Sequence, residues 1–201
     1  MLINASKLVG YPVLSLHVGG EVARVVGLVI DPAKLQIVAL KVDGADVRNA
    51  PEAREFLETR DVREFANIGM IIDSSERFVK ADDVLKLQEI LALEFSPMGL
   101  KVETKKGSYL GKVTDVTVDT ETMKIQQLIV RRPMLKALMD PELIIPRKEI
   151  VEVTDFKIIV KDEEEKIRMK ALREDFVPNF VNPFREPDFS SRKVVREKGD
   201  E

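Results

Sequence analysis

Apolar and polar residues alternate with the two-residue period of half-buried strands over much of the segment 10–161. Val116 and Val118, for example, alternate with polar neighbours. Each long run ends in a turn that contains an aspartate, Asp31 or Asp119, and a second apolar run returns from it. Because aspartate can bond its own backbone in a turn, each pair of runs predicts a β-hairpin. The predicted strands are 21–31 and 35–42 in the first hairpin, and 109–119 and 123–130 in the second.

The two hairpins belong to an internal repeat with a shift of 88 positions. Val25 falls on Val113, and the match continues without a gap as far as Ile71 and Ile159. Dropping one residue in the first turn extends it upstream, so that the repeated unit is 10–73 and again 99–161. Two copies are too few for a solenoid. They predict two similar small domains in tandem, with two halves of one larger fold as the alternative.

Further short strands are expected in each unit after the hairpin. In the second unit, 142–145 predicts a strand that Pro146 stops, and 149–160 predicts two strands around a turn at Thr154-Asp155. Five or six short strands in a unit of this size cannot hide both faces in an open sheet, whereas a barrel removes the exposed edges. We therefore predict a mainly β fold of two tandem small barrels.

A helical pattern separates the two units. Apolar residues recur at helical spacing within 80–95, and two aspartates stand in the first turn, which predicts an amphipathic linker helix. The hairpin strand of the first unit is apolar on both faces, with Val29 as well as Leu28 and Ile30. That strand is therefore the expected partner of the helix. The apolar stripe consists of Val84, Leu87, Ile90 and Leu91.

Composition narrows the class of protein further. The 32 basic and 35 acidic residues give a net charge of −3, so the chain lacks the overall basic excess that general nucleic-acid binding requires. There is no cysteine, which rules out disulfides and thiolate sites. No signal-peptide pattern and no apolar run of ~20 residues is present. These features predict a cytoplasmic protein without a membrane span.

The second unit contains a set of small and apolar motifs: Gly99 with Val102, the Gly111–Asp115 core, the turn at Asp119, and Pro146 followed by Ile150. These motifs resemble the PRC-barrel domain family. The first unit departs from this pattern: Ala23-Arg24 replace Gly-Lys and Glu58 replaces the corner proline. The domains expected from the resemblance are a PRC-like barrel at 1–79, a linker helix at 80–95, a second barrel at 96–161, and a helix with an extended tail at 162–201.

The resemblance implies a six-stranded barrel in each copy and a docking function. Members of this family share core positions and no common active site, and their theme is binding to another macromolecule, including the ribosome in a maturation factor. We therefore expect a non-enzymatic protein-interaction adaptor without cofactor or metal, with homo-oligomerisation possible. The alternative is an RNA- or ribosome-associated maturation factor.

Residues that suggest catalysis have simpler explanations. Asp31 and Asp119 recur because hairpin corners favour aspartate, and His17 has no identifiable catalytic partner. The acidic run 162–165 follows the last strand directly. Its consecutive acids point in several directions, whereas calcium ligands must converge. We expect no catalytic, cofactor or metal site from these residues.

Two segments are the candidate partner-binding sites. The loop after the second hairpin is the most basic of the predicted barrels, with Arg131, Arg132 and Lys136, and it differs from the corresponding loop of the first copy. A merely solvated loop is the simpler alternative. The proline-containing tail is unusually rich in phenylalanine, which either packs on the chain's own barrel or anchors a partner. Its aromatic residues are Phe176, Phe180, Phe184 and Phe189.

Overall fold

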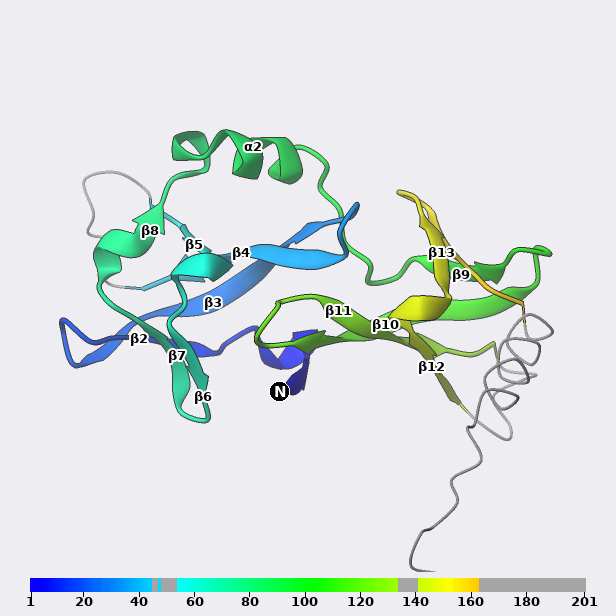
Figure 1. The fold of residues 1–201 in the computed structure, drawn as a ribbon, viewed down its shortest axis with the longest axis horizontal. Coiled ribbons are helices and arrows are strands. Elements are labelled where there is room, and N and C mark those ends of the chain that lie inside the picture. Colours follow the sequence, from blue (N-terminus) through cyan, green and yellow to red (C-terminus); the bar gives the residue numbers. More distant parts are fainter. Residues whose placement is uncertain (45–46, 48–53, 134–140, 163–201) are drawn as a thin grey trace, which may run out of the picture. The chain divides into compact units, whose positions relative to one another are not determined.

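Both predicted hairpins are present in the computed structural model, which describes residues 1–44, 47, 54–133 and 141–162 (Figure 1). In the first repeat, β3 (Gly20–Asp31) turns back into β4 (Gln36–Asp43). In the second repeat, β10 (Tyr109–Asp119) turns back into β11 (Ile125–Arg131). The expected helix and tail at 162–201, with its four phenylalanines, lie outside the described residues, except for Asp162.

Each hairpin belongs to a seven-stranded sheet. The order in the first is β6-β7-β2-β3-β4-β5-β8, and in the second β12-β11-β10-β9-β14-β13, with β1 pairing to β10. The remaining strands are β1 (Leu2–Asn4), β2 (Pro12–Ser15), β5 (Phe56–Glu58), β6 (Glu64–Ala66), β7 (Gly69–Ile72), β8 (Phe78–Val79), β9 (Lys101–Thr104), β12 (Glu142–Pro146), β13 (Ile150–Val153) and β14 (Lys157–Val160). Single 3₁₀ turns lie at Ala5–Lys7 (η1), Thr59–Asp61 (η2), Ser75–Arg77 (η3), Ala81–Asp83 (η4) and Arg147–Glu149 (η5).

Six strands of each sheet follow the same order, so the sequence repeat is also a repeat of topology. The first strand of each repeat pairs with the long hairpin strand on one side and runs parallel to the last strand on the other. The equivalent registers are Val13 with Met70 in one sheet and Val102 with Ile158 in the other. The mainly β class predicted from the sequence is confirmed.

The expected closed barrels are not observed among the described residues. The strand order of each sheet has two free ends, β6 and β8 in the first and β12 and β13 in the second. In the second repeat, β12 and β13 follow each other in the chain, but the 3₁₀ turn η5 separates them. The strands at both edges are short, which limits edge-to-edge pairing.

The linker contains a single described α-helix, α2 (Leu85–Leu91), shorter than the predicted 80–95. Residue 84 is extended and 81–83 form the 3₁₀ turn η4, while Glu94 has a left-handed backbone (φ 46°) just after the helix. The expected partner is confirmed, because Leu87 and Ile90 share an apolar cluster with Val29 of the first sheet. No helix in the described part of the chain is long and apolar enough to cross a membrane.

Both sheets contribute to one apolar core, and residues Met1–Asp162 form one compact unit. The hairpin turns of the two repeats also hydrogen-bond to each other. The Ile37 amide donates to the Met123 carbonyl at 2.8 Å, and the Ile125 amide donates to the Leu35 carbonyl at 2.9 Å. Leu35 and Met123 occupy equivalent positions, and both are buried with positive φ (45° and 55°). The division into domains at 79 and 96 stays a prediction.

Candidate functional site

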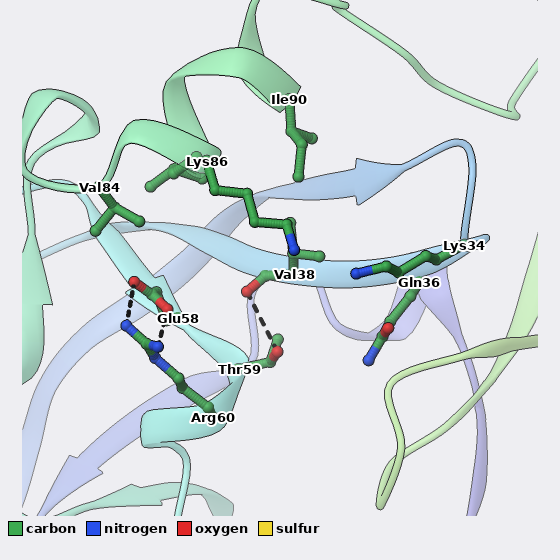
Figure 2. A pocket seen from close by; sticks show the side chains of 10 residues that line it. Lys34, Gln36, Val38, Glu58, Thr59, Arg60, Val84, Lys86 and Ile90 are labelled. Atoms are coloured by element: carbon green, nitrogen blue, oxygen red, sulfur yellow. Dashed lines mark hydrogen bonds and ion pairs between the residues drawn. The ribbon is translucent and has the colours of Figure 1, made fainter.

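A pocket of about 310 Å³ lies between α2 and the first sheet (Figure 2). Its apolar wall comes from the inner face of the helix and from Val38 of β4. Its polar groups come from the β3–β4 turn, from the start of β4, and from the segment that joins β5 to η2. The lining residues are Lys34, Gln36, Val38, Glu58, Thr59, Arg60, Val84, Lys86, Leu87 and Ile90.

Two lysines from distant parts of the sequence converge on this pocket. Lys34 stands in the β3–β4 turn and Lys86 on α2, and Figure 2 shows their side chains pointing toward each other. The neighbouring ammonium of Lys34 lowers the pKa of Lys86, through a direct side-chain contact and through charge repulsion. The docking of the helix on the sheet therefore holds two like charges together.

The other polar groups of the pocket are paired within the protein. Arg60 Nε lies 2.6 Å from Glu58 Oε2, and the Thr59 hydroxyl donates to the Val38 carbonyl at 3.2 Å. Gln36 Nε2 donates to the Thr122 carbonyl at 2.8 Å. Lys34 Nζ lies 3.8 Å from Asp31 Oδ2, a long ion pair. The two lysines are thus the cations of the pocket with the least compensation.

The second repeat has a hollow at the equivalent place, with different chemistry. It is lined by Leu2, Asp119, Gln126, Gln127, Pro146, Arg147 and Lys148. With the shift of 88, Val38 corresponds to Gln126 and Thr59 to Arg147. Leu2 of β1 lines this hollow, whereas α2 lines the first. Thr122 stands where the first repeat has Lys34, so the lysine pair is found in one repeat only.

The two repeated aspartates are turn residues, as predicted. Asp31 Oδ1 accepts from the amides of Ala33 and Lys34 at 2.9 and 3.1 Å. Asp119 Oδ2 accepts from the Thr122 hydroxyl at 2.7 Å, and this hydrogen bond is the main reason that the pKa of Asp119 is lowered. In the described part of the chain, no group of three or more His, Asp or Glu side chains is placed to hold a metal ion.

Exposed apolar side chains occupy the same turn in both repeats. Ile68, between β6 and β7, is 71% exposed, and Phe156, between β13 and β14, is 82% exposed. Their positions differ by 88, so they are equivalent. The sequence match passes directly through these positions, but the pattern alone did not indicate that both side chains would face solvent.

A row of basic side chains crosses the second sheet. Lys101 on β9 is opposite Lys112 on β10, and Lys112 is opposite Arg131 on β11. All three are exposed, and no ion pair joins them to an acidic side chain in the described residues. Like charges directly opposite each other destabilise a sheet. The equivalent positions of the first sheet are Pro12, Arg24 and Asp43, so this row is also found in one repeat only.

Of the partner-binding residues proposed from the sequence, only Arg131 and Arg132 lie in the described part of the chain. Arg131 ends β11 in the basic row, and Arg132 follows it, half-buried, with its amide bonded to the Pro141 carbonyl. Lys136 lies outside the described residues, as do all four tail phenylalanines. The pocket lysines were missed because their meeting depends on how α2 docks. The strand register that places Lys101 opposite Lys112 could likewise not be predicted from the sequence pattern.

Comparison with known proteins supports one part of the resemblance. Residues 95–167 match the PRC-barrel domain family. The matched segment contains the second repeat, and the match does not extend to the first. No curated protein matches the chain at a significant level.

Proposed function

We propose that this protein is a non-enzymatic protein-interaction adaptor, in which two PRC-like repeats present docking groups on one scaffold. The match of 95–167 to the PRC-barrel domain supports an interaction role in general terms. The observation that carries the proposal is the equivalent exposure of Ile68 and Phe156. A large apolar side chain at a turn tip gains nothing from the fold, whereas a bound partner would remove it from water.

The experiment is affinity capture from the native cell with the full chain as bait. The test variant combines Ile68→Ser with Phe156→Ser. The matched control is Leu85→Ser, which removes an apolar side chain that is 73% exposed at the start of α2. A partner that the control retains and the double variant loses supports the proposal. A partner retained equally by both variants would overturn the role of the turn tips.

The role of the tail is tested in the same experiment with a deletion variant. Deleting 176–201 removes Phe176, Phe180, Phe184 and Phe189 and leaves the two sheets intact. If these side chains anchor a partner, the deletion reduces capture while thermal unfolding of the protein is unchanged. If they pack on the chain itself, the deletion lowers the unfolding temperature instead. The two outcomes separate the alternatives that the sequence leaves open.

A second candidate function is RNA or ribosome association, favoured by the basic row. Lys101, Lys112 and Arg131 form a line of cations across three neighbouring strands, which is an arrangement suited to a phosphate backbone. The net charge of −3 ranks this function second, because the chain has no overall basic excess.

Salt-dependent RNA binding tests the second candidate. Replacing the three basic residues with glutamine should reduce the slope of log K against log salt by roughly two, at about 0.7 per phosphate contact on single-stranded RNA. Arg24→Gln is the matched control, because Arg24 is the counterpart of Lys112 in the first repeat and is paired with Glu21 at 2.6 Å. An unchanged slope in the triple variant would show that Lys101, Lys112 and Arg131 do not bind RNA.

A further inference from the structure

We infer that the pocket between α2 and the first sheet binds a small organic anion, with its apolar body against the helix and its negative group between Lys34 and Lys86. This binding site is independent of the adaptor function. The ligand class is a carboxylate joined to a short hydrocarbon chain.

The pocket has room and an apolar surface for the body of such a ligand. Its volume of about 310 Å³ lies at the lower end of the range for small-molecule sites and exceeds what a bare ion needs. Val38, Val84, Leu87 and Ile90 line it. Leu87 and Ile90 are themselves held in the apolar cluster with Val29, so this wall is fixed by packing and does not depend on the ligand.

Among the described residues, the carboxylates near the charged end of the pocket, Asp31 and Glu89, only partly offset the two ammonium groups. Asp31 is 3.8 Å from Lys34 and also caps two amides of its own turn. Glu89 on α2 attracts Lys86 weakly, and Glu58 is already bound by Arg60. The contact with Lys34, its charge repulsion and a smaller effect of burial together lower the pKa of Lys86 despite the attraction of Asp31 and Glu89. A bound carboxylate would relieve this repulsion.

The fold does not require the lysine pair. In the second repeat, Thr122 replaces Lys34 and bonds the turn aspartate directly at 2.7 Å, and Leu2 lines the hollow in place of a helix. The same hairpin turn therefore forms with a threonine that hydrogen-bonds the turn aspartate. The Lys34 ammonium is farther from Asp31, at 3.8 Å, so it can also bind a ligand.

Titration of the full chain with sodium octanoate tests the inference, followed by lysine-selective NMR and calorimetry. Octanoate has both the chain and the carboxylate, 1-octanol has the chain alone, and inorganic phosphate has the charge alone. We expect octanoate to bind more tightly than either. Lys34→Gln and Lys86→Gln should each weaken octanoate binding by about threefold or more, as expected for partly exposed charge pairs. Lys41→Gln is the control, since Lys41 is paired with Glu55 at 3.2 Å.

A second readout separates binding at the pocket from a general effect of charge. Octanoate should raise the pKa of Lys86 toward its usual value, because the bound carboxylate offsets the repulsion of Lys34. Thermal unfolding of the lysine variants without ligand should match that of the unmodified protein, since both side chains are exposed. Equal binding of octanol and octanoate, or octanoate binding unchanged by both substitutions, would overturn the inference.

Discussion

Gly111 occupies a position at which the first repeat has Ala23, and the reason lies on the neighbouring strand. A Cβ on Gly111 would lie 2.0 Å from the Arg131 carbonyl oxygen, and its φ of 147° is itself strained for other residues. In the first repeat the crowded glycine is Gly44 instead, where a Cβ would lie 2.3 Å from the Val22 carbonyl oxygen. Gly44 is the counterpart of Arg132. The first repeat thus has its tightly packed glycine just after β4, where the second repeat has Arg132.

Gly111→Ala should therefore destabilise the protein by about 2 kcal/mol or more, since both the contact and the backbone conformation oppose a Cβ. Urea unfolding measures the change as a lower midpoint. Gly20→Ala is the matched control. It lies at the start of the equivalent long strand, where an added Cβ would have no atom within 4 Å, and should change stability by less than ~1 kcal/mol.

The Asp119 turn gives a prediction for pH dependence. The folded pKa of Asp119 is lowered, chiefly by the Thr122 hydroxyl, so the carboxylate stabilises the fold above the unfolded pKa of ~3.9. This contribution is lost as the pH falls through the folded pKa. Thr122→Val should raise the pKa of Asp119, and the stability difference from the unmodified protein should be present at neutral pH and shrink in acid.

Carboxyl ¹³C NMR and urea unfolding at several pH values measure both effects. Thr114→Val, on the same strand, is the control. The Thr114 hydroxyl donates to the neutral Ile129 carbonyl at 3.2 Å, so its removal should give a stability change that does not depend on this carboxylate. A pKa of Asp119 that stays unchanged in Thr122→Val would contradict the assigned cause.

At the scale of elements, α2 is stabilised by two side chains that reach the outer face of the first sheet. Leu87 is 3% exposed in a cluster with Val29 and Ala39. Leu87→Ala should lower the free energy of unfolding by about 2–4 kcal/mol, because it removes buried contacts and leaves a cavity. Leu85→Ala, on the exposed side of the same helix, should cost less than ~0.5 kcal/mol. Equal losses in the two variants would contradict this packing.

The elements could be predicted from the sequence where a local pattern determined them. The alternation around Val116 predicted the long hairpin strands, and the apolar outer face at Val29 predicted where the linker helix packs. The end of that helix at Leu91 could not be predicted, since the apolar pattern of 80–95 does not mark it. Barrel closure is not observed among the described residues, because the number of strands in a unit does not determine whether its edge strands pair.

The candidate site was predicted less well, for the same physical reason. Lys34 and Lys86 are 52 positions apart (86 − 34), and neither belongs to a motif. Their approach follows from the rotation of α2 on the sheet, which is set by packing of Leu87 and Ile90 and not by any pattern at the lysines. Arg131 was identified from the charge of its loop and from the difference between the two copies, and only the strand register places it in a row with Lys112.

At the scale of the whole described unit, the two repeats associate through equivalent segments. The reciprocal bonds from Ile37 to Met123 and from Ile125 to Leu35 have the form of an isologous contact, in which each side offers the same groups. Gln36 and Lys124, which are again equivalent, form the bridge between them. The tandem chain thus resembles a symmetric dimer joined by a linker. These hydrogen bonds join the two repeats within the compact unit Met1–Asp162.

Arg147 breaks this symmetry and gives the last prediction. Its guanidinium donates to the carbonyls of Leu35 at 2.9 Å and of Ile125 at 3.0 Å, and also to that of Lys34. Arg147→Met should therefore loosen the contact between the repeats. Hydrogen exchange at the Ile37 and Ile125 amides should rise by about tenfold or more, because bonds from a charged donor are each worth about 1.5–3 kcal/mol.

The location of the change distinguishes this effect from general destabilisation. Amides inside each sheet, such as that of Val113, which donates to Leu100, should keep their protection if only the contact opens. Lys148→Met is the matched control, since Lys148 is the next residue, is exposed, and reaches none of these carbonyls in the described structure. If both substitutions increased exchange equally across the two sheets, Arg147 would support the fold of its own repeat and not the contact. Exchange confined to the turns would instead show that the repeats can separate before either unfolds.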